Sequence, residues 1–181
     1  MQILDDGWDS RATLVDDVWL ERTPRRPEVA PRLLLETRLL PWLAEQLPLP
    51  VPQPEVVWSA PLRIRHRLLA GHRSASLTQQ QAHVLGRFLR VLHGVEVAQA
   101  VRAGVPPPRA AVREQTRTRA RFAAEVLPRL PPREREIGAA LLGRTAQRAP
   151  SVSLVHGDLG PAHVLSEYGE LTGVIDWSDA H

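Results

Sequence analysis

The sequence predicts an α+β fold in two lobes, from the order in which its patterns follow one another. Strand-like apolar stretches with one helical pattern among them fill the first 70 residues, and helical patterns dominate from residue 78 to residue 147. Two short strand patterns that carry polar residues close the chain. We therefore expect a small β-rich lobe over residues 1–70 and a mainly helical lobe over residues 71–181.

The first lobe begins with a predicted β-hairpin. Apolar residues and turn residues place its strands at residues 3–4 and 12–15, with a turn at Asp5-Asp6-Gly7, and a third strand at residues 18–22. A helix follows from Pro27, which suits a first helical turn. The positions expected on its buried face are Val29, Leu33, Glu36 or Thr37, Leu40 and Leu43.

Prolines and turn residues set the remaining boundaries. Pro41 is expected to end or kink the first helix. Alternating prolines over residues 48–54 predict an extended connector. Thr78 and Gln81 form a capping-box pattern, which predicts the start of a helix. The later elements are expected as strands at 56–58 and 62–69, a helix to about residue 93, helices at 112–127 and 133–147, and strands at 153–155 and 171–175.

Composition and charge narrow the class of protein. All 23 basic residues are arginine, so the pI is about 10.7 although the net charge is only +3. These arginines are scattered among 20 acidic residues without interleaved aromatic residues, which disfavours nucleic-acid binding. No apolar run approaches the roughly 18 residues of a membrane span, and the first residues lack a signal-peptide pattern. With no cysteine either, a cytoplasmic protein fits best.

Polar residues gather around the last two strand patterns. Residues 154–165 read LVHGDLGPAHVL, and residues 173–177 read GVIDW. We expect Asp158, His163 and Asp176 to converge at the strand ends. Asp158 can accept the proton of an acceptor hydroxyl there, while His163 and Asp176 can hold Mg²⁺ on nucleotide phosphates. A metal hydrolase uses the same ligand types, although this spacing alone is unspecific.

These two segments resemble the motif H-G-D-x-x-x-x-N and the following I-D-W of the aminoglycoside phosphotransferase family, which has the protein-kinase fold. The resemblance implies that Asp158 is the catalytic aspartate and that Asp176 binds Mg²⁺. His163 stands where the family usually has asparagine, and this variant is similar to the macrolide 2′-phosphotransferase branch. Because Mg²⁺ prefers oxygen ligands, His163 either ligates the metal or binds a metal-bound water or a phosphate oxygen.

A second resemblance lies in residues 19–29, which read WLERTPRRPEV. This segment is similar to the third strand and following turn of the same family. The resemblance implies that Arg22 replaces the nucleotide-binding lysine of kinases and pairs with Glu36 on the next helix. Arginine is always charged and can bind phosphate bidentately, so it suits this role. Residues 7–10 stand where the family has its phosphate-binding loop, and Ser10 is expected to contact the nucleotide.

Two further expectations concern the same region. Residues 65–70 are expected to form the hinge between the lobes, whose backbone would meet the purine of ATP or GTP. His156 is expected to hold the catalytic loop in place by packing and hydrogen bonding, without a direct chemical role.

Together these residues favour a phosphotransferase that moves the γ-phosphate of ATP or GTP to a hydroxyl of a small molecule. A macrolide is favoured as the acceptor by His163 and by the arginine-rich segment. An aminoglycoside or a metabolite such as homoserine or choline stays open. The expected partners are the acceptor and the nucleoside triphosphate, with neither nucleic acid nor membrane, and the oligomeric state is not indicated.

The resemblance also bears on the extent of the chain. In the family a long helical segment follows the I-D-W motif, so we expect this chain to be a C-terminally truncated form with an incomplete helical lobe. The alternative function is therefore a catalytically inactive kinase-like module.

Overall fold

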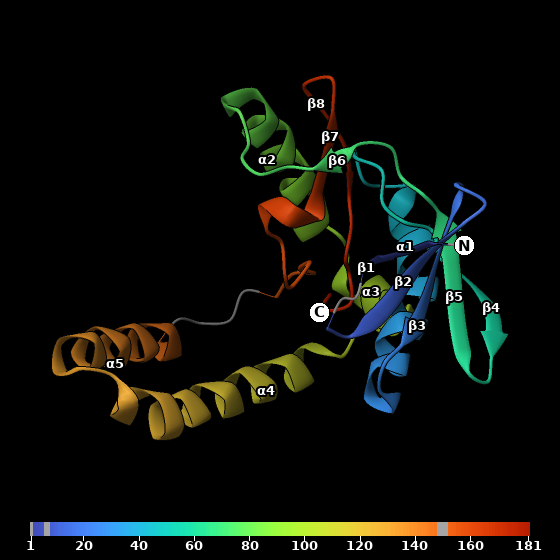
Figure 1. Cartoon of the computed structure of the whole chain (residues 1–181). Coiled ribbons are helices and arrows are strands. Elements are labelled where there is room, and N and C mark those ends of the chain that lie inside the picture. The colour runs from blue at the N-terminus through green and yellow to red at the C-terminus, as the bar shows by residue number, and fades with distance from the viewer. Residues whose placement is uncertain (1, 6–7, 148–151) are drawn as a thin grey trace. The chain divides into compact units, whose positions relative to one another are not determined.

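The computed structural model describes residues 2–5, 8–147 and 152–181 and forms two compact units (Figure 1). The first unit contains Met1–Val105 and Ser153–His181, and the second contains Pro106–Val152. Asp6 and Gly7 of the predicted turn lie outside the described residues. The division into lobes after residue 70 stays a prediction.

A five-stranded antiparallel sheet forms the first part of the first unit. Its strand order is β1-β2-β3-β5-β4. The strands are β1 (Gln2–Asp5), β2 (Ser10–Val15), β3 (Trp19–Pro24), β4 (Glu55–Ser59) and β5 (Leu62–Arg67). Arg22 on the central strand β3 lies opposite Ala12 of β2 and Ile64 of β5. All five strands expected before residue 70 are therefore present, and β1 is the one expected at residues 3–4.

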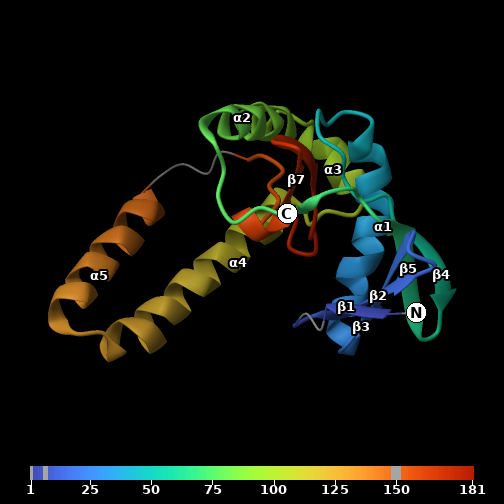
Figure 2. The ribbon, with the colours of Figure 1, turned by 45° about the horizontal axis from the view of Figure 1, so that its top comes forward.

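The helix α1 (Ala30–Ala44) follows a short 3₁₀ turn, η1 (Pro27–Val29), and lies beside this sheet in both views (Figures 1 and 2). Of the two outcomes expected at Pro41, the end of the helix is wrong, since the helix continues to Ala44, and a kink stays a prediction. An internal proline costs about 3 kcal/mol. Burial of a leucine contributes roughly 1.5–3 kcal/mol, and Leu40 and Leu43 on either side of Pro41 are both fully buried. Packing therefore offsets the cost of the proline.

The remainder of the first unit combines two helices with a three-stranded sheet. The helices are α2 (Gln79–His93) and α3 (Val97–Arg102), and the strands are β6 (His72–Arg73), β7 (Val164–Glu167) and β8 (Glu170–Val174) in the order β6-β7-β8. The capping box of Thr78 and Gln81 is formed as predicted. The sequence analysis did not identify β6 or β7, which are only two and four residues long.

The predicted strand at residues 153–155 is wrong. Val155 is extended beside His181 and exchanges two backbone hydrogen bonds with it, at 2.8 and 3.2 Å. This single pair does not continue into a ladder, so residues 153–155 lie in a loop. The pairing nevertheless fixes the backbone that leads into the catalytic motif.

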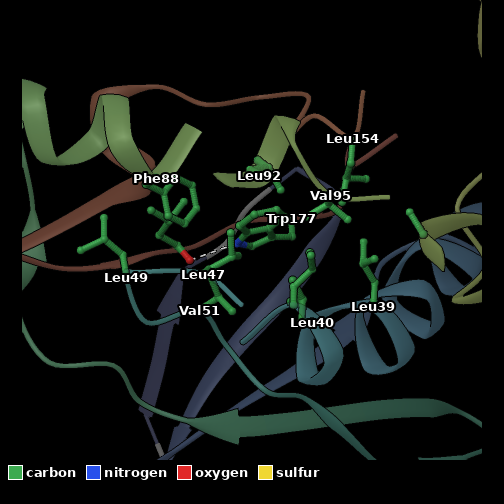
Figure 3. Close-up of a cluster of buried hydrophobic side chains, with 14 of the residues drawn as sticks. Leu39, Leu40, Leu47, Leu49, Val51, Phe88, Leu92, Val95, Leu154 and Trp177 are labelled. Atoms are coloured by element: carbon green, nitrogen blue, oxygen red, sulfur yellow. Dashed lines mark hydrogen bonds between the residues drawn. The ribbon is translucent and has the colours of Figure 1, made fainter. Parts of the chain in front are cut away.

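One hydrophobic core joins α1, the proline-rich connector, α2 and the last segment of the chain (Figure 3). Trp177 is 1% exposed and packs against Phe88 of α2, with ring centroids 6.2 Å apart in an edge-to-face arrangement. The indole Nε1 of Trp177 donates to the Val174 carbonyl at 3.0 Å. The connector contributes Leu49 and Val51, so the segment expected only as a linker is also part of the core.

The second unit is a pair of helices. The helix α4 (Pro108–Arg121) continues through a π turn, η2 (Phe122–Val126), and a 3₁₀ turn, η3 (Leu127–Arg129), into α5 (Pro132–Gln147). The two predicted helices are thus confirmed, with α4 starting four residues earlier at Pro108. Among the residues that the structure describes, no helix is long and apolar enough to cross a membrane.

We expect Phe88→Ala to lower the free energy of unfolding by about 3–5 kcal/mol, because it removes a fully buried ring from the core beside Trp177. Urea denaturation followed by tryptophan fluorescence would measure the loss. Val91→Ala on the same helix is the control, since Val91 is 38% exposed. An equal loss in both variants would contradict this assignment of the core.

Candidate active site

A buried ion pair links β3 to α1. The Arg22 Nη1 donates to both carboxylate oxygens of Glu36, at 3.0 and 2.7 Å. The Glu36 side chain is 2% exposed and that of Arg22 is 11% exposed. The pair expected from the sequence is therefore brought together, with the rest of the guanidinium available to other groups.

Two serine hydroxyls complete the surroundings of Arg22. The Arg22 Nε donates to Ser10 Oγ at 3.2 Å, and Nη2 donates to Ser178 Oγ at 2.9 Å. The Ser178 hydroxyl in turn donates to Glu36 Oε1 at 2.8 Å. Ser10 was predicted as a nucleotide-binding residue and here contacts the cation of the predicted site. Ser178 was not predicted.

The buried carboxylate of Glu36 needs partners that stabilise its charge. Burial raises the pKa of Glu36 above its ordinary value, although the charge of Arg22 and the hydrogen bond from Ser178 both act to lower it. A buried carboxylate without these partners would be strongly destabilising. Arg22 and Ser178 are therefore what allow an acid at this position of α1.

The three predicted residues of the catalytic motif lie in a row. The His163 Nε2 is 3.6 Å from Asp176 Oδ2, and its Nδ1 is 3.8 Å from Asp158 Oδ2. The Nδ1 also forms a short hydrogen bond with the backbone carbonyl of Asp158. The side chains of Asp158 and Asp176 are 64% and 47% exposed, so both carboxylates can meet a ligand.

The two ring nitrogens of His163 face different neighbours. Nδ1 lies against a carbonyl oxygen, which can only accept, so Nδ1 donates in this contact, while Nε2 faces the Asp176 carboxylate. Metal-binding histidines commonly donate their second ring N–H in this way. Among the described residues no group of three or more acidic, histidine or cysteine side chains is arranged around one point for a metal. Mg²⁺ ordinarily takes only one or two carboxylates and completes its shell with phosphate oxygens and water, and the exposed carboxylate of Asp176 fits that set of ligands.

His156 holds the loop that carries Asp158. Its Nε2 donates to the Ile175 carbonyl at 2.9 Å, and its Nδ1 accepts from the Asp158 backbone N–H at 3.4 Å. The ring is 2% exposed and lies 4.6 Å from the Trp177 ring, centroid to centroid. Burial lowers the pKa of His156, which favours the neutral form that these two bonds require. The structure supports the positioning role expected for it.

The backbone at the site is tightly constrained. Gly157 has a φ of 89°, and a Cβ there would overlap the backbone carbonyl of Asp179. Asp176 has a φ of 65°, an uncommon conformation for a residue with a side chain. The turn after β8 therefore packs directly on the catalytic loop and aims the Asp176 carboxylate toward His163.

A cleft of about 740 Å³ in the first unit collects most of these residues. Ser10, Arg22, Asp158 and Asp176 line it, and Glu36 and His163 contact two of these lining residues, Arg22 and Asp176. His66, Leu68 and Leu69 from the predicted hinge also line the cleft. Residues from both ends of the sequence thus surround one concave space, which is large enough for a nucleotide-sized ligand.

Comparison with known proteins accounts for this arrangement. A family model described as the phosphotransferase enzyme family (APH) matches residues 1–181. The chain belongs to this APH family. A comparison with curated protein sequences finds no match.

Several solved structures share the fold of this APH-family chain. A GDP complex of a mutant aminoglycoside 2′-phosphotransferase-IIIa has a TM-score of 0.83 at 25% identity, and the GDP and kanamycin complex of APH(2″)-IIIa has 0.81 at 26%. The macrolide 2′-phosphotransferase MphH from Brachybacterium faecium has a TM-score of 0.76 at 32% identity. These similarities cover 99% of this chain and 66%, 67% and 66% of those chains, respectively, so the present sequence spans about two thirds of their length.

The main residue that the sequence analysis missed is Ser178. It directly follows the I-D-W motif, and its only signal is that a small polar residue stands there. Its importance depends on the sharp turn at Asp176, which brings it within reach of residues that lie over 140 positions earlier. Such long-range contact has no local sequence pattern.

We expect the stability of the protein to decrease as the pH falls below about 6.5, partly because of His66. His66 is 5% exposed, and burial lowers its pKa below 6.5, so the unfolded chain binds the proton more readily. The contribution of neutral His66 to the stability of the folded state is therefore fully present above pH 6.5, and it decreases as the pH falls below this value. Melting temperatures from pH 7.5 to 5.5 should fall less steeply in His66→Asn than in the wild type, while the exposed-site control His83→Asn should keep the wild-type slope.

We expect Gly157→Ala to destabilise the protein by about 1–3 kcal/mol, through both its left-handed φ and the overlap with Asp179. Gly160→Ala in the same loop is the matched control, because that glycine has a φ of −130° and no atom within 4 Å of an added Cβ. Chemical denaturation would separate the two variants. Equal stability of both would contradict the close packing of the loop on Asp179.

Proposed function

We propose that this protein transfers the γ-phosphate of a nucleoside triphosphate to a hydroxyl group of a small molecule. The proposal is supported by one observation above all: Arg22, which is paired with Glu36, lines the same cleft as Asp158 and Asp176, and His163 lies between these two carboxylates. Phosphoryl transfer needs a cation for the phosphates, a group that orients the attacking hydroxyl, and a metal ligand, in one place.

Each residue then has a distinct role. The exposed carboxylate of Asp158 orients the acceptor hydroxyl and accepts its proton. Arg22, held by Glu36, faces the donor phosphates with a charge that does not titrate. Asp176 and His163 would hold Mg²⁺, which when bound neutralises phosphate charge during transfer. These groups are already in position, so they can orient the two substrates for direct transfer. No covalent intermediate on the protein is then needed.

The relatives suggest both donor and acceptor. Structural neighbours are solved as complexes with GDP, and a more distant one with ATP and streptomycin, so a guanine or adenine nucleotide is proposed as the donor. Macrolide and aminoglycoside phosphotransferases are both among them. We favour a macrolide acceptor, because His163 and the segment RTPRR at residues 22–26 resemble the macrolide branch.

A second candidate is a kinase-like module that binds nucleotide without transferring phosphate. The observation that favours it is His163 in place of asparagine, since imidazole is a poorer ligand for Mg²⁺ than an oxygen. This candidate predicts nucleotide binding in the absence of phosphate transfer to any acceptor.

Transfer from radiolabelled ATP and GTP to a panel of macrolides and aminoglycosides, with and without Mg²⁺, tests the proposal. We expect Asp158→Asn to lower the rate about 10²–10⁴-fold with little change in nucleotide affinity, because the hydroxyl loses its base. Asp176→Asn should abolish the effect of Mg²⁺ on nucleotide binding. Asp17→Asn, an exposed carboxylate outside the cleft, is the control.

Undiminished transfer in Asp158→Asn would refute the catalytic role of this residue. Nucleotide binding by the wild type without transfer to any acceptor would favour the second candidate. Absence of both binding and transfer would refute the proposed function as a whole.

A further inference from the structure

Two side chains of the helix α1 contact two consecutive residues after Asp176, namely Ser178 and Asp179. Arg32 Nη1 donates to Asp179 Oδ1 at 3.0 Å, and Glu36 Oε1 accepts from Ser178 at 2.8 Å. Arg32 and Glu36 are four residues apart, so they lie on one face of the helix. The Arg32–Asp179 ion pair is exposed and by itself contributes little to the stability of the fold. The Ser178 contact is buried and involves the ion pair of the site.

Ser178 uses its hydroxyl as both acceptor and donor. It is 7% exposed, accepts from Arg22 Nη2 at 2.9 Å and donates to Glu36 Oε1. With Ser10 on Nε and Glu36 on Nη1, the guanidinium is thereby fixed at all three of its nitrogens. The next group that Nη2 could reach is the Asp176 carboxylate, whose Oδ1 is 3.9 Å away.

We infer that Ser178 is a positioning residue that holds the Arg22 guanidinium away from Asp176 and so leaves that carboxylate available to a cation. Without the hydroxyl, Nη2 would lose its partner in a buried site and turn to Asp176. A close Arg22–Asp176 pair would then compete with a metal for the same oxygen. This inference rests on the proposed function, because it assigns Ser178 to the use of Asp176 as a metal ligand.

The backbone around Ser178 is held independently of its hydroxyl. Trp177 is buried in the core on one side, and His181 pairs with Val155 on the other. Asp179 packs against Gly157. Replacement of the Ser178 side chain should therefore change the direction of Arg22 without moving Asp176, so that an effect on metal binding can be separated from an effect on folding.

The Mg²⁺ concentration that gives half-maximal binding of GTP and of ATP, measured by calorimetry, tests the inference. Loss of a group that supports a metal ligand commonly costs 10–100-fold in metal affinity. We expect Ser178→Ala and the similarly shaped Ser178→Cys to raise this concentration at least about tenfold, with a smaller change in nucleotide affinity without Mg²⁺. Ser74→Ala is the control. Like Ser178, Ser74 is buried and its hydroxyl is hydrogen-bonded, here to Ser166 Oγ at 2.8 Å, but it does not line the cleft.

A double-mutant cycle identifies the cause. If Ser178 acts through Arg22, adding Ser178→Ala to Arg22→Gln should leave the Mg²⁺ requirement of the single Arg22→Gln variant unchanged. Melting temperatures of all variants would show that they fold, and the cysteine variant carries the test if the alanine variant does not.

A wild-type Mg²⁺ requirement in both Ser178→Ala and Ser178→Cys would overturn the inference while leaving the proposed function intact. A full tenfold effect of Ser178→Ala in the Arg22→Gln background would also overturn it. Failure of the wild type to bind GTP or ATP at any Mg²⁺ concentration would instead overturn the proposed function and this inference together.

Discussion

The buried carboxylate of Glu36 is the constraint on which the other features of the site depend. At 2% exposure a carboxylate retains its charge only with a cation and hydrogen-bond donors in contact, and burial already raises its pKa. The strand β3 must therefore present Arg22 to α1, and the turn after Asp176 must present Ser178. Such a pair contributes little net stability compared with apolar packing. Its value lies in fixing three separate elements with respect to one another.

The hydrophobic core also holds α1 against the segment after Asp176. Leu39, Leu40 and Leu43 on α1 pack into the cluster that also contains Trp177, so one helix supports both the ion pair and the residue next to Asp176. The ring of His156 packs against both Trp177 and His163. The imidazole of His156 thus links the core at Trp177 to the backbone of Ile175 and of Asp158, with one hydrogen bond to each.

Much of this organisation could be predicted from local sequence. Strands and helices followed from periodicity and turn residues, and the capping box marked the start of α2 correctly. Asp158, Asp176 and Arg22 were indicated by resemblance to family motifs, and the structure brings all three to one cleft. The errors occurred where tertiary packing overrides local preference: α1 passes through Pro41, and residues 153–155 find only one backbone partner. Ser178 shows the same limit, because its role exists only after the chain has turned at Asp176.

The proposed role of Arg22 as the phosphate-binding cation also has a consequence for how such a nucleotide site can be detected. The chain contains no lysine at all, since its 23 basic residues are all arginine. Chemical reporters that recognise nucleotide sites by acylating the side-chain amine of a nearby lysine have no such amine to modify here, because guanidinium is far less nucleophilic and always protonated. Surveys of nucleotide-binding proteins with such reagents would pass over this chain even with its cleft occupied.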